Sequence, residues 1–234
     1  MHASSTPAAN RLLRALPAAD CRRLFPQLEA VNLRPGATLF EPAAPAQFAY
    51  FPVNSVVTLS YPIGQGAMAK CCSIGRDGMV GVSLFLDGPE DGNRAEVESG
   101  GLAFRLSAAA LRAEFHRAGA LQRLLLRYVY ALVTQSSQLC VCQQHHTVGQ
   151  RLCGLLSRAF SEANGKVAFI TQARIGELLG VRRESITEVA SRLQGARIIE
   201  YCRGQITLLD RARLEERACA CDRIIRRALA AVSQ

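Results

Sequence analysis

Small polar and charged side chains gather in one short segment near the C-terminal end of the chain. Residues 170–193 read ITQARIGELLGVRRESITEVASRL, in which Thr171 can cap a first helix and Gly180 can end it in a tight turn. A second helix then follows, and its buried face carries apolar residues at helical spacing, Ile186, Val189, Ala190 and Leu193. Geometry turns Arg183 and Glu184 outward at its start, where a major-groove helix contacts base edges. Arginine can form two hydrogen bonds to guanine, and glutamate can accept one from cytosine, so the pattern predicts a DNA-reading helix.

The other predicted DNA contacts surround this helix. Thr171 and Gln172 begin the first helix and suit phosphate contacts, which position a protein without reading sequence. Two β-prone runs, 197–201 and 205–209, predict a hairpin, or wing, with Arg203 at its tip. Glu188 would repel phosphates unless it accepts from a base or pairs with Arg192 one turn later. The predicted DNA-binding residues are Thr171, Gln172, Arg182, Arg183, Glu184, Ser185, Thr187, Glu188 and Arg203. A helical hairpin with a solvated charged face remains the alternative.

The positive charge of the chain is concentrated around the same segment. Residues 149–234 hold 15 of the 28 Lys and Arg and 9 of the 19 Asp and Glu, which gives +6 of the net charge of +9. This excess favours a polyanion partner, although a basic chain can also simply be more soluble. No apolar run approaches the ~20 residues of a membrane helix, and residues 1–9 lack the apolar core of a signal peptide. We therefore expect a cytoplasmic protein without a membrane partner.

The nine cysteines and four histidines form no familiar catalytic or metal-binding motif. The closest pairs are Cys71-Cys72, Cys140-x-Cys142 and Cys219-x-Cys221. None has the CxxC-type spacing of zinc sites, and no nucleophile has a base at catalytic spacing. Cys142, His145 and His146 would share one side of a helix, where a thiol is most often a small core residue. We predict no metal, no catalytic residues and no enzyme activity.

The rest of the chain predicts an α+β protein. Residues 1–10 are typical of a flexible tail, and short helices are expected at 11–16 and 20–28. From Val31 to Arg105, short apolar or alternating runs separated by Gly and Pro predict an antiparallel β domain. The expected strands are 38–40, 48–53, 56–61, 69–74 and 102–106. Ser107 can then cap a short helix that runs to about Arg117.

The longest periodic segment predicts a helix over residues 119–147 that pairs with a second copy of the chain. Its apolar residues recur in steps of four and three, which is typical of a coiled-coil seam. The predicted interface residues are Leu121, Leu125, Tyr128, Leu132, Gln135, Leu139 and Cys142. Leu124, Val129 and Val133 widen the apolar face, so the helix should also lean on the β domain. An ordinary buried amphipathic helix is the alternative.

In its order of β domain, long helix and winged helix-turn-helix, and in the string IGELLGVRRESITEVASRLQ, the chain resembles the Crp/Fnr superfamily of bacterial transcription regulators. The resemblance implies a β-roll (a double-stranded β-helix like that of cyclic-nucleotide-binding domains) at 11–118, a dimerisation helix at 119–147 and a winged helix-turn-helix at 148–234. The family's base-reading Arg-Glu pair falls on Arg183-Glu184. A third reading position, often Arg in the family, is Glu188 here, so the DNA half-site should differ. The implied partners are an inverted-repeat DNA duplex, a second copy of the chain and RNA polymerase.

The resemblance also implies a place where the family binds a cyclic nucleotide. The phosphate-binding cassette resembles Gly78 to Gly81 through Arg94-Ala95, but Met79 replaces the glutamate that normally holds the ribose. The loop 87–93 is longer and more acidic than usual. The implied effector residues are Gly78, Met79, Arg94, Ala95, Ser136 and Ser137. We expect a changed ligand, or none, rather than cyclic AMP.

Together these patterns predict a sequence-specific transcription regulator that binds DNA as a homodimer, without control by cyclic AMP and without a cofactor. Two alternatives remain open. One is a redox- or metal-responsive DNA-binding sensor that uses its cysteines. The other is a nucleotide-binding regulatory protein or thiol enzyme that does not bind DNA.

Overall fold

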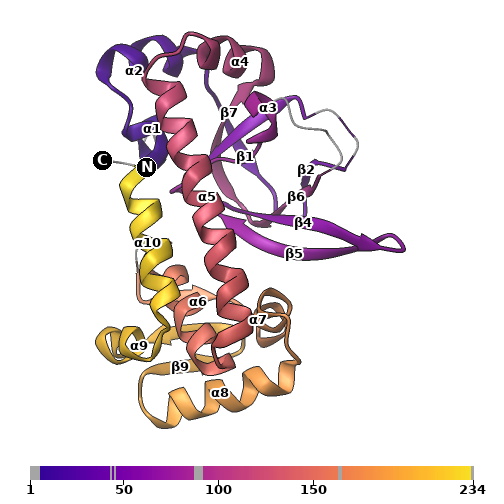
Figure 1. Ribbon diagram of the computed structural model, residues 1–234, viewed down its shortest axis with the longest axis vertical. Helices are drawn as coiled ribbons and strands as arrows, with labels where there is room; N and C mark the ends of the chain where they lie inside the picture. The colour runs from indigo at the N-terminus through magenta and orange to yellow at the C-terminus, as the bar shows by residue number, and fades with distance from the viewer. Residues whose placement is uncertain (1–5, 43, 45, 87–91, 163–164, 233–234) are drawn as a thin grey trace. The chain divides into compact units, whose positions relative to one another are not determined.

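The computed structural model describes residues 6–42, 44, 46–86, 92–162 and 165–232, and it divides into two compact units (Figure 1). One unit extends to Tyr130 and also includes the chain from Leu229 onward, and the other is Ala131–Ala228. Residues 1–5 of the predicted tail and residues 87–91 of the predicted acidic loop lie outside the described part. Among the described residues, no helix combines the length and apolar character needed to cross a bilayer.

The N-terminal unit begins with short helices that cover one end of a β domain. A 3-10 turn at Pro7–Ala9 leads into α1 (Arg11–Arg14), α2 (Ala18–Leu24) and a second 3-10 turn at Phe25–Gln27. Asn10 is buried, and its side-chain amide donates to the carbonyls of Pro52 and Gly78 at 2.8 and 3.0 Å. The prediction of a flexible tail as far as residue 10 is therefore wrong at its C-terminal end, because this buried asparagine anchors the chain.

Two antiparallel sheets enclose the core of this unit. In the described residues the first has the order β1-β7-β3 and the second the order β2-β6-β4-β5. The strands are β1 (Glu29–Leu33), β2 (Thr38–Phe40), β3 (Phe48–Pro52), β4 (Val56–Gly64), β5 (Ala67–Ile74), β6 (Arg94–Ser99) and β7 (Gly101–Ser107). Apolar residues from both sheets meet between them, among them Tyr50, Val57, Val97 and Ala103. The predicted strands are confirmed, and β1 and β6 are additions that the sequence pattern did not predict.

Two further helices complete the unit, and the long helix follows. The short helices are α3 (Ser83–Leu86) and α4 (Ala108–His116), and the Ser107 hydroxyl caps α4 by accepting from Ala110 N at 3.2 Å, as predicted. The long helix α5 spans Ala120–His145, which confirms the helix predicted over 119–147.

The predicted dimer seam on α5 is partly wrong. Leu121, Leu125 and Tyr128 are buried within the N-terminal unit, and Cys142 is buried within the C-terminal unit. These four side chains already have partners in their own chain, so they are not available to a second copy. Leu132, Gln135 and Leu139 are half-buried, and their role in a dimer stays a prediction.

The C-terminal unit builds a helical core around a small sheet. Its elements are α6 (Val148–Glu162), β8 (Val167–Phe169), α7 (Gln172–Leu179), α8 (Arg183–Gly195), β9 (Ile199–Cys202), β10 (Gln205–Leu208) and α9 (Arg211–Arg217). Helix α10 (Ala220–Val232) follows, and it belongs to this unit as far as Ala228. Leu156, Ile175, Ile186 and Ile206 are among the fully buried side chains at its centre. The predicted hairpin is confirmed, and β8 adds a third strand to give the order β8-β10-β9.

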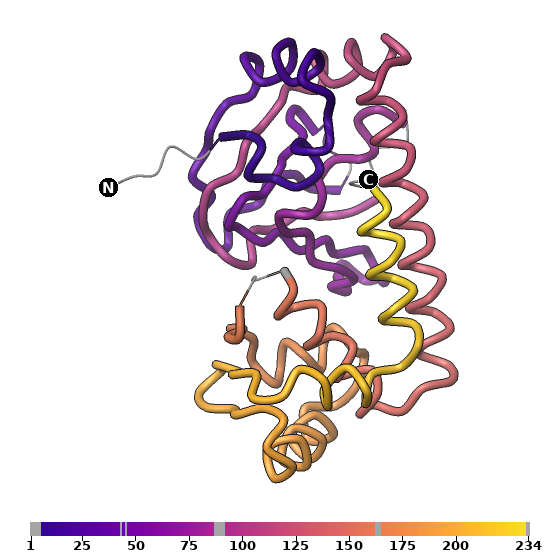
Figure 2. Tube along the Cα trace, turned by 90° about the vertical axis from the view of Figure 1, so that its left-hand side faces the viewer, coloured from indigo at the N-terminus to yellow at the C-terminus, as the bar shows by residue number. Residues whose placement is uncertain are grey.

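The chain after the wing forms two helices, α9 and α10. The Asp210 carboxylate caps α9 by accepting from Arg213 N at 3.0 Å, as expected of a residue that opens a helix. The helix then stops, because Ala218 adopts an extended conformation, and α10 begins two residues later. Within residues 131–228, the last turn of α5 and the first turn of α10 lie side by side (Figure 2).

Candidate nucleic-acid interface

The turn between α7 and α8 has the geometry that its sequence predicts. The Thr171 hydroxyl accepts from Arg174 N at 3.2 Å and so caps α7. Gly180 ends α7 with φ at 62°, a left-handed conformation that glycine adopts without strain. A side chain at Gly176 would bring its Cβ to 2.9 Å from the Val181 carbonyl oxygen. Glycine at position 176 therefore lets the turn close tightly against α7.

Helix α8 presents one apolar and one polar face. Ile186, Val189, Ala190 and Leu193 are buried, as predicted from their spacing. Arg182, Arg183, Glu184, Thr187 and Glu188 are exposed, and Ser185 is partly exposed. Arg182 precedes the helix in an extended conformation, so Arg183 and Glu184 occupy its first turn. The helix thus offers two arginines and a glutamate to solvent at its N-terminal end.

One ion pair lies on the exposed face of α8. Glu188 pairs with Arg192 one turn later, with Oε1 3.0 Å from Nη2, which is one of the two arrangements that the sequence allowed. Among the described residues Arg182 and Arg183 form no ion pair. Their guanidinium groups can therefore meet an external acceptor without losing an internal partner.

The two helices are held in register by side chains at their exposed edge. The Thr187 hydroxyl donates to Gln172 Oε1 at 2.8 Å, so two predicted contact residues bind each other. The backbone N–H of Gln172 donates to the Tyr201 hydroxyl at 3.1 Å. Tyr201 lies on β9, and its sequence pattern gave it no role beyond a strand. Its hydroxyl fixes the start of α7, so it is a positioning residue for the predicted phosphate contacts.

The wing is a hairpin with a two-residue turn. Arg203 and Gly204 both have positive φ, 47° and 84°, which matches the turn that twisted antiparallel strands favour. The Ile170 N–H donates to the Gly204 carbonyl at 2.9 Å and holds the turn beside the start of α7. Arg203 is exposed at the tip, where the sequence places it.

The predicted effector residues Gly78 and Met79 are covered by the side chain of Tyr128. Met79 is fully buried, and its N–H donates to the Tyr128 hydroxyl, which in turn donates to the Met79 carbonyl, both at 3.2 Å. A Cβ at Gly78 would lie 2.3 Å from the same hydroxyl. Tyr128 therefore occupies the surface of the Gly78-Met79 backbone.

The remaining effector residues are not assembled into an anion site. Arg94 Nε is 2.7 Å from Glu41 Oε2, so its charge is already neutralised by a carboxylate. Ala95 is buried in the core, and Ser136 and Ser137 are exposed on the part of α5 that belongs to the C-terminal unit. A phosphate at Arg94 would have to displace Glu41.

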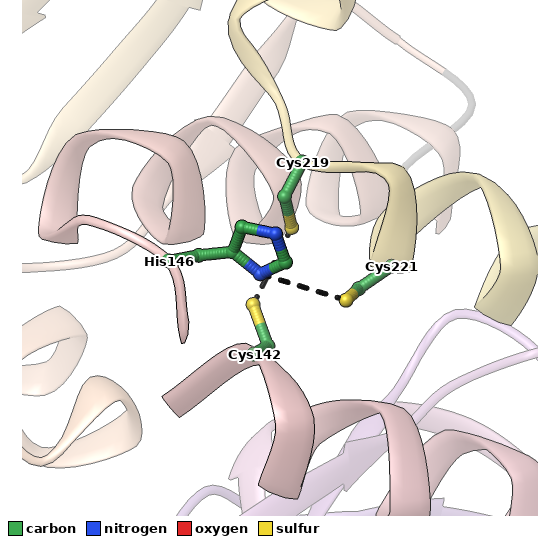
Figure 3. Close-up of side chains that lie close together, drawn as sticks. All are labelled: Cys142, His146, Cys219 and Cys221. Carbon is green, nitrogen blue, oxygen red and sulfur yellow. Dashed lines mark hydrogen bonds between the residues drawn. The ribbon is translucent and has the colours of Figure 1, made fainter. Parts of the chain in front are cut away.

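Four side chains that are far apart in the sequence come together in the C-terminal unit (Figure 3). The ligand-type atoms of Cys142, His146, Cys219 and Cys221 all lie within 4.8 Å of one another. Burial, followed by the neighbouring Cys219 thiol, raises the pKa of Cys142 to about 12, and burial raises the pKa of Cys221. Without a cation nearby, these thiols would be protonated at neutral pH.

Comparisons with known proteins agree with this geometry. Residues 150–217 match the family described as Crp-like helix-turn-helix domain. No curated protein sequence matches the chain. Among solved structures, FixK2 from Bradyrhizobium japonicum is 17% identical with a TM-score of 0.72, over 82% of this chain and 98% of that one. TTHB099, a transcriptional regulator of the CRP family from Thermus thermophilus, is 19% identical with a TM-score of 0.64, over 80% and 96%.

A third solved structure is similar over the same extent. The c-di-GMP responsive global regulator CLP of Xanthomonas campestris is 16% identical with a TM-score of 0.60, over 82% of this chain and 99% of that one. At identities this low, the structural similarity establishes a shared fold and nothing more. The matched domain adds that the region from α6 to α9 is a helix-turn-helix DNA-binding domain. The chain therefore carries a Crp-like helix-turn-helix domain, and it shares its fold with regulators of the Crp family.

Proposed function

We propose that this protein is a transcription regulator of the Crp/Fnr type that binds an inverted-repeat DNA site as a homodimer, with α8 of each protomer in the major groove. The observation that carries the proposal is the exposed first turn of α8, where Arg183 and Glu184 face solvent above a buried apolar face. Arg183 can bond guanine through both its terminal nitrogens, and Glu184 can accept from cytosine. Thr171, Gln172, Arg182, Ser185, Thr187, Glu188 and Arg203 are proposed to complete the interface. The protein acts by binding rather than by catalysis.

Selection of bound sequences from random duplex DNA tests this proposal. We expect a palindromic motif with half-sites one helical turn apart, roughly 34 Å. Arg183→Ala should relax the preference at one base pair and weaken binding by roughly 1–3 kcal/mol. Arg227→Ala is the matched control, because Arg227 is an exposed arginine of α10 and its loss removes the same charge. Equal weakening in both variants, with an unchanged motif, would show that Arg183 acts only through charge.

The proposed dimer uses the exposed side of α5 in place of the buried seam residues. Leu126, Tyr130 and Val133 are 48%, 72% and 58% exposed, and they follow one another in steps of four and three. Exposed apolar residues at this spacing along one helix are typical of a helix that packs against a second copy. Val133→Glu should give a monomer in analytical ultracentrifugation, whereas Gln143→Glu, an exposed position on the same helix, should leave the oligomeric state unchanged.

The N-terminal unit is proposed to act without cyclic AMP. Two observations support this: the backbone of Met79 is already hydrogen-bonded to the Tyr128 hydroxyl, and Arg94 is already paired with Glu41. Contact with RNA polymerase is a further part of the proposal, and it rests on the resemblance of the chain to Crp/Fnr transcription regulators. DNA binding measured with and without cyclic AMP should give the same affinity.

A further inference from the structure

The buried cluster of Cys142, His146, Cys219 and Cys221 has a chemistry that DNA binding does not use. Three thiols and an imidazole point toward a common centre (Figure 3). Three of the four residues are buried, and no carboxylate belongs to the group. Thiolate and imidazole are the ligands that zinc takes in structural sites of the Cys3His type.

The distances between these atoms match the edges of a zinc tetrahedron. Zinc–sulfur bonds of about 2.3 Å and zinc–nitrogen bonds of about 2.0 Å place two sulfurs about 3.8 Å apart, and a sulfur and a nitrogen about 3.5 Å apart. Cys142 Sγ and Cys219 Sγ are 3.4 Å apart, and Cys221 Sγ and His146 Nδ1 are 3.7 Å apart. Since all four atoms lie within 4.8 Å of one another, the space between them suits one ion and is too narrow for a cluster of several irons.

The local structure explains how the four residues converge. Cys142 and His146 are one helical turn apart at the end of α5, and the His146 N–H still donates to the Cys142 carbonyl at 3.1 Å. The break at Ala218 places Cys219 just before α10 and Cys221 in its first turn. The N-terminal end of a helix carries a partial positive charge, which favours thiolates over thiols.

Neither a role in core packing nor a disulfide accounts for all four residues of the cluster. Thiols that merely fill a core are dispersed among apolar side chains, as Cys153 is. Here three thiols contact one another in a small cluster of their own, with an imidazole at its edge. A disulfide would join only two of the three sulfurs and would leave a thiol and the histidine without a role.

We propose that Cys142, His146, Cys219 and Cys221 bind one zinc ion. The site lies at both borders of the DNA-binding domain, because the Crp-like match covers residues 150–217 and the two ligand pairs flank it. The ion would therefore tie α10 and the end of the domain to the end of α5. Its role is structural, since all four positions of the tetrahedron are taken by protein.

The test uses the full-length protein, prepared without a histidine tag and with thiols protected from air. Mass spectrometry of the metal content should find about one zinc per chain. Cys219→Ala and His146→Ala should each lose most of it. His146→Cys should retain it, because four thiolates also bind zinc. Cys153→Ala is the matched control, since Cys153 is a buried cysteine of the same unit outside the group, and it should keep the wild-type zinc content.

A second measurement does not depend on the folding of any variant. Wild-type protein stripped of zinc and titrated with Co²⁺ should show the charge-transfer band of thiolate-bound cobalt and saturate at about one ion per chain. Absence of this band, or full zinc retention in both alanine variants, would overturn the proposal. A disulfide from Cys142 to Cys219 or Cys221 in the freshly isolated protein would also overturn it. None of these three results would bear on DNA binding by α8, which the selection experiment measures separately.

Discussion

Replacement of Gly176 by alanine should loosen the helix-turn-helix at its tightest point. The added Cβ would lie 2.9 Å from the Val181 carbonyl oxygen and 3.7 Å from the Arg183 backbone nitrogen. Both atoms belong to the backbone, so no flexible side chain can move aside. To make room, the turn and the first residues of α8 would have to shift together.

The size of the effect follows from two opposing terms. Alanine is favoured over glycine inside a helix by about 1 kcal/mol. Forcing an extra carbon into a packed site costs about 1–3 kcal/mol, and a rigid backbone neighbour puts Gly176 toward the upper end. We expect a net destabilisation of about 1–2 kcal/mol.

Gly195 provides a matched control within α8. A Cβ there meets no atom within 4 Å, and its φ is not in the left-handed region. Gly195→Ala should therefore be neutral or slightly stabilising, because only the helix preference applies. Urea unfolding followed by circular dichroism would measure both variants, and fluorescence anisotropy would measure DNA binding. If Gly176→Ala were as stable as Gly195→Ala and bound DNA equally well, the close contact between α7 and the turn would not exist.

Two further predictions concern buried polar groups. Tyr128→Phe leaves the buried Met79 N–H without its acceptor and should lower the unfolding free energy by about 1–3 kcal/mol. Its control is Tyr61→Phe, which removes only an exposed hydrogen bond from Asn93 and should change the unfolding free energy little, and equal unfolding midpoints for the two variants would contradict the Tyr128 contact. Asp222 is 1% exposed, and its carboxylate pairs with Arg158 at 2.9 Å and with Arg226 at 3.0 Å. Asp222→Ala should therefore lower the free energy of unfolding by about 2–3 kcal/mol. The loss stays at this size because both arginines are partly exposed and can be solvated when their partner is removed. The control is Glu188→Ala, which breaks the exposed pair of Glu188 and Arg192 and should lower the free energy of unfolding by about 0–1 kcal/mol. If the two variants unfolded at similar temperatures, the buried ion pairs of Asp222 would not stabilise the protein.

The helix-turn-helix could be predicted from sequence because its signals are local. A capping threonine, a glycine with positive φ and apolar residues at helical spacing each act within a few residues of one another. The same is true of the wing, where Arg203-Gly204 sets the turn. Strand β8 was not predicted because its three residues pair with β10, nearly forty positions away, and nothing in so short a run specifies that partner.

The dimer seam shows the limit of periodicity. A heptad pattern tells which residues of α5 share a face, but not what that face contacts. Leu121, Leu125 and Tyr128 share a face that the chain's own N-terminal unit covers, and the Tyr128 hydroxyl satisfies the backbone of Met79. The next exposed stripe, at Leu126, Tyr130 and Val133, repeats in the same steps and was hidden by the stronger pattern.

The thiol cluster was beyond sequence reasoning for a different reason. Cys142 and Cys219 are 77 positions apart, so their pairing depends on how α10 folds back. Neither half has the spacing that marks a zinc site by itself, because one pair is separated by a helical turn and the other by a helix start. Cys219 and Cys221 face α5 because the helical region breaks between α9 and α10 at Ala218. No Gly or Pro at that position indicates the break in the sequence.

This break also gives α10 a defined place in the C-terminal unit. The helix lies beyond the matched domain, and a terminal helix held only by apolar contacts is free to fray or rotate. Two polar contacts restrict α10 near its first turn: Asp222 pairs with Arg158 of α6, and the thiol cluster joins it to α5. Gly154 brings α6 close, since a Cβ there would lie 3.2 Å from the Asp222 Cβ. Hydrogen-bonded ion pairs are directional, and so would be the bonds to the proposed zinc ion, so these contacts would fix the rotation of α10 as well as its position. The two contacts therefore fasten α6, which begins the matched domain, and the end of α5 to the same turn of α10.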